Sequence, residues 1–177
     1  MASSRHRKLY TENELYDYAI GALARRMRSV AELKRLLRHR VEPETELGDT
    51  LIELVVGRLK AQGYLNDSLY AAAYSSYRRD NEKFGRGRVI WDLRAKGVHG
   101  DVIENAIAST YGEVDEEKQA RRYLRRKRFE KPANNKQVAR IFRQLVRAGF
   151  GRRTIIKILK QWEIDEEVLT HLESEQE

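Results

Sequence analysis

The feature that most constrains the fold of this chain is a short phrase that recurs at similar intervals. A leucine is followed four positions later by glycine and then by an apolar residue, at residues 93–98 and 145–150. A looser copy at residues 36–41 has Arg40 in place of the glycine, and Arg40, Gly97 and Gly149 are 57 and 52 residues apart. Such a period is typical of repeat proteins, in which each unit packs against its neighbours. We therefore predict three diverged repeats.

Within each repeat, apolar residues recur at three- and four-residue spacing, which predicts helices. Gly63 and Gly97 each follow such a stripe. We interpret them as helix stops, because glycine adopts the left-handed conformation that closes a last turn. Ser29 and Glu32 have the spacing of a capping box and therefore predict a helix start.

The helix that follows Gly63 has Asn66 and Asp67 as candidate caps. Its apolar stripe, which we expect to be buried, consists of Leu69, Tyr70, Ala73, Tyr74 and Tyr77. A base-stacking platform is the alternative for three of these tyrosines and for both tryptophans, namely Tyr70, Tyr74, Tyr77, Trp91 and Trp162. We favour core packing, since the tyrosines share their stripe with leucine and alanine.

These patterns predict an all-α fold, an elongated array of three tandem three-helix repeats. The composition suits an array, because only 41% of the residues are apolar while 35% are charged. The predicted parts are a disordered basic N-terminus, three repeats of which the third is strongly basic, and an acidic C-terminal tail. They occupy residues 1–11, 12–63, 64–112, 113–162 and 163–177.

The net charge of +8 is distributed unevenly along the chain. Residues 115–160 contain 16 basic and 4 acidic side chains, whereas residues 161–177 contain no basic and 7 acidic ones. Four acids cannot neutralise sixteen bases, so we favour contact with phosphates or an acidic protein surface over a merely solvated helix face. The acidic end is a candidate competitor for the same surface.

Twelve arginines are the candidate contacts with such a partner. Those of the basic helix are Arg121, Arg122, Arg125, Arg126 and Arg128, and the others are Arg140, Arg143, Arg147, Arg152, Arg153, Arg86 and Arg88. The last two belong to the segment 84–88, in which two glycines precede a helix. Such a helix start can hold an anion, and a plain turn is an equally good explanation.

Sites for catalysis, metals and cofactors are not indicated. The four histidines are scattered with no spacing for a shared metal, and there is no cysteine, as is typical of a protein of the reducing cytoplasm. The glycines of segment 84–88 lack the third glycine of a dinucleotide fingerprint. No apolar run approaches the roughly 20 residues of a membrane helix. We expect a cytoplasmic protein that is not an enzyme, binds no cofactor and contacts no membrane.

Four segments resemble, in order and spacing, the RecX family of bacterial regulatory proteins. They are Ala19-x-x-Ala22-Leu23-x-Arg25-Arg26-x-x-Ser29-x-x-Glu32-Leu33, Gly63-Tyr64-Leu65-Asn66-Asp67-x-x-Tyr70-Ala71, Gly85-x-x-Arg88-Val89-x-x-x-Leu93-x-x-Lys96-Gly97-Val98 and Leu145-x-x-x-Gly149-Phe150. The residues that we assign to the structural motif are Ser29, Glu32, Gly63, Tyr64, Asp67, Gly85, Gly97 and Gly149. The resemblance spans about residues 15–162 and departs from the pattern at Arg40-Val41 and in the acidic end.

The resemblance implies an all-helical protein of tandem three-helix repeats that binds the RecA recombinase on DNA, and we expect this protein to be a monomer. It further implies restraint of the RecA filament, with effects on strand exchange, ATP hydrolysis and coprotease activity, and hence on DNA recombination, DNA repair and the SOS response. It implies no catalytic residues. The alternative is a general nucleic-acid-binding helical-repeat protein that covers single- or double-stranded DNA weakly and without sequence preference.

Overall fold

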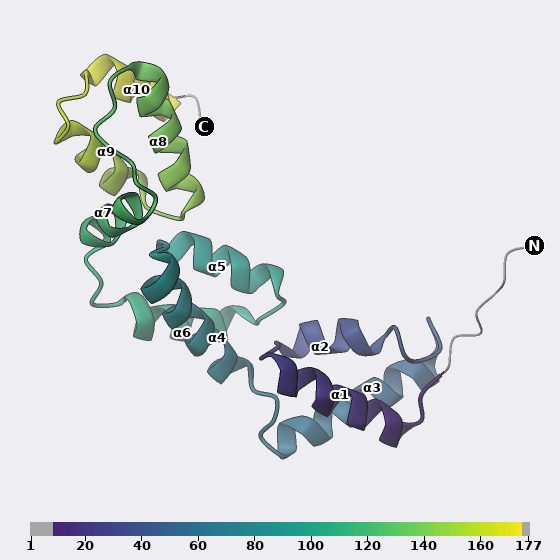
Figure 1. Cartoon of the computed structure of the whole chain (residues 1–177). Coiled ribbons are helices and arrows are strands. Elements are labelled where there is room, and N and C mark those ends of the chain that lie inside the picture. Colours follow the sequence, from purple (N-terminus) through teal and green to yellow (C-terminus); the bar gives the residue numbers. More distant parts are fainter. Residues whose placement is uncertain (1–8, 175–177) are drawn as a thin grey trace, which may run out of the picture. The chain divides into compact units, whose positions relative to one another are not determined.

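The computed structural model describes residues 9–174, and all regular secondary structure in this range is helical (Figure 1). The prediction of an all-α fold is confirmed. The helices are α1 (Glu12–Arg25), α2 (Val30–Leu37), α3 (Glu46–Ala61), α4 (Asp67–Tyr77), α5 (Arg86–Ala95), α6 (Gly100–Tyr111), α7 (Glu116–Arg126), α8 (Asn135–Arg147), α9 (Arg152–Lys160) and α10 (Glu166–Ser174). A π-helical turn, Arg78–Glu82, directly continues α4.

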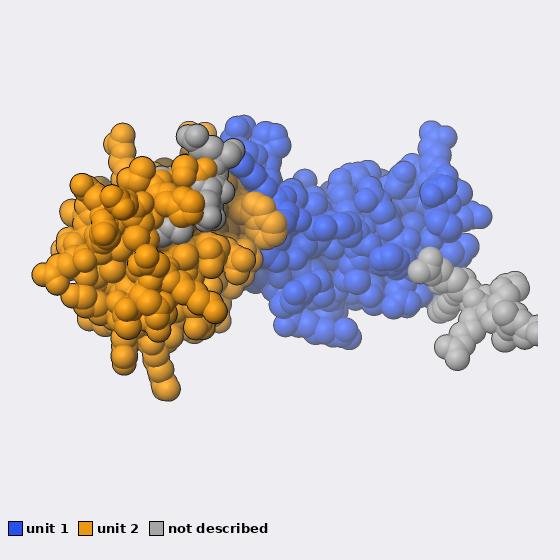
Figure 2. Space-filling view, turned by 90° about the horizontal axis from the view of Figure 1, so that it is seen from above, with its two compact units in different colours: residues 1–71, 94–102 blue, residues 72–93, 103–177 orange. Residues whose placement is uncertain are grey.

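The chain divides into two compact units (Figure 2). Unit 1 comprises residues 1–71 and 94–102, and unit 2 comprises residues 72–93 and 103–177. The boundary falls within α4, α5 and α6, which belong to the predicted middle repeat. This division does not test the repeat boundaries, so the partition into three repeats stays a prediction.

Each unit has its own apolar core. In unit 1, α1, α2 and α3 pack on one another through leucines and isoleucines such as Leu15, Leu33 and Ile52. In unit 2, α7, α8, α9 and α10 surround Tyr123 and Phe142. These helices are therefore held together by burial of one apolar stripe each, as their spacing predicts.

The predicted glycine stops at Gly63 and Gly97 are confirmed, because their φ values are 77° and 74°. Gly149, with φ of 85°, ends α8 in the same conformation. The chain at Gly149 closes α8 in the manner of a Schellman motif. The N–H of Phe150 donates to the carbonyl of Leu145 at 3.2 Å. Only glycine adopts this conformation without steric cost.

Arg40 closes α2 differently, which accounts for the departure of residues 36–41 from the glycine pattern. It is not among the positive-φ residues, and its N–H donates to Leu37 O at 2.7 Å. Its guanidinium lies over the rings of Tyr10 and Tyr18, at 5.4 and 4.7 Å from their centroids. The turn is thus tightened by hydrogen bonds and fixed by cation–π contacts. Of the predicted disordered terminus, residues 1–8 lie outside the described range, whereas Thr11 caps α1.

The prediction that the whole apolar stripe of α4 is buried is wrong. Leu69 and Tyr77 are 63% and 56% exposed, and Ala73 is exposed, while Tyr70 is buried. The buried side is instead centred on small residues, since Ala71 and Ser75 are fully covered. Small side chains allow close approach of a neighbouring backbone, so packing rotated the buried face by about one position from the apolar stripe.

The expectation of core packing for the tryptophans holds for one of them. Trp91 is 61% exposed, so it is not a core residue. Trp162 is partly buried and packs against the core of unit 2.

Candidate functional site

Helix α7 carries the densest group of basic side chains in unit 2. Asp115 caps its first turn by accepting a hydrogen bond from Lys118 N at 3.0 Å. Its apolar stripe, Ala120, Tyr123 and Leu124, is buried as the sequence predicts. The arginines of the helix are consequently left on its exposed and half-exposed sides.

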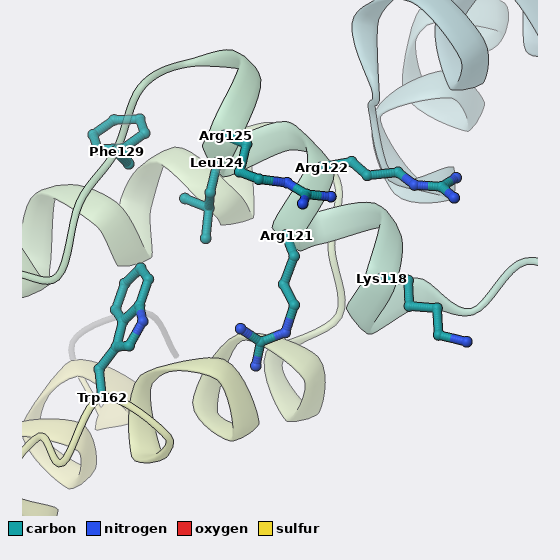
Figure 3. A pocket seen from close by; sticks show the side chains of 7 residues that line it. All are labelled: Lys118, Arg121, Arg122, Leu124, Arg125, Phe129 and Trp162. Carbon is teal, nitrogen blue, oxygen red and sulfur yellow. The ribbon is translucent and has the colours of Figure 1, made fainter.

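Four cations of α7 line one pocket of about 350 Å³ together with three apolar side chains (Figure 3). The residues are Lys118, Arg121, Arg122, Leu124, Arg125, Phe129 and Trp162. Cations three, four and seven positions after Lys118 lie along one side of a helix. Phe129 follows α7, and Trp162 lies just beyond the end of α9. The pocket therefore joins a cationic helix face to aromatic surface.

Two acids contact this group of cations, Asp115 at 3.7 Å from Lys118 and, more closely, Glu117. Its carboxylate accepts hydrogen bonds from Arg121 at 3.1 Å and Gln161 at 3.2 Å, and it lies 2.8 Å from Lys157 Nζ. The hydrogen bond from Lys157 lowers the pKa of Glu117, and the same contact raises the pKa of Lys157. One carboxylate is thus shared by two cations, so the local charge stays positive.

The remaining arginines of the basic helix have different surroundings. Arg126 pairs with Glu82 at 3.2 Å. Arg128 is exposed and has φ of 56°, so it occupies the left-handed position after α7 that glycine usually fills. Arg126 therefore contributes an ion pair, and Arg128 belongs to the turn that ends α7. The charge pattern of the sequence alone did not predict either role.

A second group of candidate arginines gathers where α5 approaches the end of α8. Arg86, Arg88 and Arg147 line a pocket of about 500 Å³ with the exposed Trp91. The guanidinium of Arg88 lies 4.8 Å from the centroid of the Trp91 ring system. Arg140, Arg143, Arg152 and Arg153 are exposed on α8 and α9. The twelve candidates are therefore spread over several surfaces rather than collected in one site.

The glycines of segment 84–88 serve a close backbone crossing. Gly85 N donates to Ala148 O at 2.8 Å, and Gly87 N donates to Gly149 O at 3.0 Å. A Cβ on Gly85 would lie 2.6 Å from the carbonyl carbon of Gly149, which is closer than real Cβ contacts. Because these two N–H groups are already used, an anion at this place would have to be held by the arginine side chains.

The motif residues of unit 1 meet at the start of α2. Ser29 and Glu32 form the predicted capping box, and Ser29 Oγ also donates to Lys96 O at 2.6 Å. Asp67 accepts from Val30 N at 2.8 Å, so it caps α2 and not its own helix. The cap of α4 is Asn66, which accepts from Ser68 N and Leu69 N.

Glu32 is the centre of this cluster. It accepts a hydrogen bond from Tyr70 at 3.1 Å and pairs with Lys96 at 3.0 Å. Gly97 follows Lys96, and a Cβ there would lie 2.5 Å from Ala31 Cβ. Burial opposes ionisation of Glu32, but the hydrogen bonds from Lys96 and from Ser29 N–H outweigh it and lower its pKa. These motif residues therefore hold unit 1 together.

Glu32→Gln should lower the free energy of unfolding at pH 7 by about 1.5–3 kcal/mol, the range for hydrogen bonds to a charged group. Because the folded-state pKa lies below the ordinary value of 4.5, this stabilisation is complete above pH 4.5 and is lost as pH falls through the folded-state pKa. Urea unfolding followed by circular dichroism at pH 7 and pH 3 measures the difference. The control is Glu53→Gln, an exposed acid paired with Lys34, which should cost under about 1 kcal/mol. If the free energy of unfolding of Glu32→Gln differs from that of the parent protein by the same amount at pH 3 as at pH 7, the ionised Glu32 carboxylate does not stabilise the fold as described.

The acidic end contributes a helix that packs on unit 2. Leu169 of α10 is buried in the core, and α10 packs against α8 and α9. Glu163 pairs with Lys131 at 2.9 Å, and Glu166 pairs with Lys160 at 2.7 Å. Both of these ion pairs thus involve lysines outside α7. Truncation before α10 would also remove a core leucine, so a test of its charge requires substitutions.

Residues 9–174 offer neither a metal-binding cluster nor a membrane-spanning helix. Histidine, aspartate and glutamate side chains form no group of three there that could hold a metal ion. No helix in the same range is long and apolar enough to cross a membrane.

Sequence comparison assigns the chain to a family. A family model described as RecX, second three-helix domain, matches residues 66–107. The regulatory protein RecX of Leptothrix cholodnii is 32% identical over 160 residues, which cover 90% of this chain and 93% of that protein. The chain belongs to the RecX family. The resemblance of its four motif segments to RecX is thereby confirmed.

Other RecX proteins are longer. The regulatory protein RecX of Bacillus subtilis is 30% identical over 161 residues, and that of Bacillus pumilus is 29% identical over 147. The matched regions cover 90% and 82% of this chain but only 59% and 54% of those proteins. The chain thus spans a little over half the length of these relatives.

Solved RecX structures have the same fold. A crystal structure of regulatory protein RecX has a TM-score of 0.64 at 22% identity and covers 85% of this chain and 71% of its own. RecX from Lactobacillus salivarius has a TM-score of 0.63 at 19% identity and covers 86% and 96%. At this identity the likeness concerns the fold alone. The RecX motif residues Ser29, Glu32, Asp67 and Gly97 then have a structural explanation in the cluster at the start of α2.

Proposed function

We propose that this RecX-family chain binds RecA recombinase filaments on DNA and restrains them, and that it does so without catalysing a reaction. Its membership in a family of regulatory proteins supports this proposal. The observation that carries it on the molecule is the cationic side of α7. Arg122 and Arg125 are exposed there and have no hydrogen-bond or ion-pair partner within residues 9–174.

Unpaired arginines on a helix suit phosphate oxygens or the carboxylates of a protein surface, and neither encodes a base sequence. We therefore expect this surface to supply affinity without sequence choice. A monomer that contacts filament protein and the enclosed DNA satisfies both chemistries. Effects on strand exchange, ATP hydrolysis and coprotease activity would follow from restraint of the filament.

Arg122→Gln combined with Arg125→Gln should weaken binding to RecA–DNA filaments and leave folding nearly intact, because both side chains lie off the buried stripe of α7. If they contact phosphates, the slope of log affinity against log salt on single strands should fall by about 0.7 per lost contact. If they contact RecA, DNA binding by the isolated protein should change little while filament restraint is lost.

Arg35→Gln combined with Arg38→Gln is the matched control, since it removes the same charge from exposed positions of unit 1. It should retain both activities. Should the α7 variant bind DNA and restrain filaments like the parent, the arginines are a solvated helix face and this part of the proposal is wrong.

The second candidate function is a helical-repeat protein that acts by covering DNA. The 16 basic side chains of residues 115–160 favour it. The covering function differs from filament restraint in stoichiometry, because covering requires one protein molecule for each DNA site.

A further inference from the structure

The pocket between α7 and the end of α9 combines an apolar side and a cationic side. Its apolar side is made by Leu124, Phe129 and Trp162. Leu124 is 3% exposed, and the other two are partly buried and pack against the core of unit 2. This side is therefore supported from behind, which favours a fixed aromatic surface.

The cationic side extends from this aromatic surface along α7. Figure 3 shows Arg121 reaching from α7 to the level of Trp162, whereas Arg122 and Lys118 extend away from the indole. Arg121 is held by Glu117 at 3.1 Å. Arg122 and Arg125 have no partner in the described part of the chain, so their charge is available to a ligand.

We propose that this pocket binds an unpaired base of single-stranded nucleic acid, which stacks on Trp162 while the adjoining phosphates contact Arg122 and Arg125. The volume of about 350 Å³ is sufficient for one small planar group. Stacking on aromatic side chains beside a positive groove is the general mode by which proteins hold single strands without sequence choice. The inference deepens the proposed function by naming the ligand of this pocket.

The chemistry of the pocket favours nucleic acid over an acidic peptide. Every nucleotide joins a planar ring to an anionic phosphate. The pocket likewise places an aromatic surface next to arginine side chains. An acidic peptide would satisfy the arginines but has no ring tied to each carboxylate. Duplex DNA keeps its bases stacked inside the helix, so only a single strand can supply the ring.

The test uses the fluorescence of the 177-residue chain without RecA. Trp91→Phe leaves Trp162 as the only tryptophan. We expect an oligothymidylate of about 12 nucleotides to quench Trp162 and to bind at least about fivefold more tightly than an abasic strand of the same length, because stacking contributes to binding. Poly-glutamate and duplex DNA of equal charge should leave the emission nearly unchanged.

Two further variants, made in the Trp91→Phe background, separate stacking from charge. Trp162→Leu should remove the preference for thymidylate over the abasic strand, with direct binding measured by anisotropy of labelled strands. Arg122→Gln with Arg125→Gln should weaken both strands and keep the preference, and this pair does not touch the core, so it remains informative even if the leucine variant is unstable. Equal affinity for the two strands, or equal quenching by poly-glutamate or duplex, would overturn the proposal. Since RecA is absent from the assay, such a failure leaves filament restraint to be decided separately.

Discussion

Gly149→Ala is expected to lower the free energy of unfolding of unit 2 by about 3–5 kcal/mol. The φ of 85° at this residue costs an L-residue about 1–2 kcal/mol. A Cβ there would collide with Arg88 N and lie 2.8 Å from Arg88 Cα. The backbone shift needed to remove that collision typically costs about 1–3 kcal/mol. It also strains the hydrogen bonds that Gly85 and Gly87 make to this segment, each contributing about 0.5–1.5 kcal/mol.

Tryptophan fluorescence during urea unfolding measures this effect, because Trp91 and Trp162 both belong to unit 2. The control is Gly57→Ala within α3, where a Cβ would meet nothing within 4 Å. That substitution should stabilise its own helix in unit 1 by about 0.5–1 kcal/mol, since alanine is the better helix former. Unit 1 contains no tryptophan, so this change is followed by circular dichroism, and the fluorescence transition of unit 2 should stay unchanged. If Gly149→Ala costs less than about 1 kcal/mol, the α5–α8 crossing is not as close as described.

Asp92→Ala should cost about 3–5 kcal/mol, the range for removing one partner of a buried ion pair. Asp92 is 5% exposed. Its carboxylate accepts hydrogen bonds from Tyr74 at 2.9 Å and Arg78 at 3.0 Å, and Arg88 Nε lies 3.0 Å from it. Removal leaves two half-buried guanidinium groups without their counter-charge. Without Asp92, the Arg88 side chain would also lose the ion pair that helps to fix it beside Trp91.

The same fluorescence measurement follows this variant. Glu104→Ala removes an exposed carboxylate of unit 2 and should change the free energy of unfolding by no more than about 0.5 kcal/mol. Equal effects of the two substitutions would show that Asp92 is not the charge that holds this cluster.

Local signals in the sequence predicted most of the helices. The capping box at Ser29 and the glycine stops at Gly63 and Gly97 each depend on residues within one turn of a helix, and all are confirmed. Long-range partners were not predictable in this way. Asp67 has the spacing of a cap for its own helix, yet it caps α2, 37 residues away.

The burial of α4 and the pocket at Trp162 show the same limit. An apolar stripe defines which residues share a helix face, but the partner decides which neighbouring face is covered, and small residues at Ala71 and Ser75 permitted the closer approach. The arginines of α7 could be singled out by charge alone. Their association with Trp162 depends on how α9 packs against α7, for which spacing along the chain gives no signal.

We propose that this RecX-family chain acts on RecA filaments and not by covering DNA. The most direct measurement is ATP hydrolysis by RecA filaments already formed on single-stranded DNA, titrated with this protein. We expect inhibition at protein concentrations far too low to occupy the DNA, and loss of this inhibition with Arg122→Gln and Arg125→Gln. Inhibition that begins only when protein equals the available DNA sites would contradict it and favour the covering function.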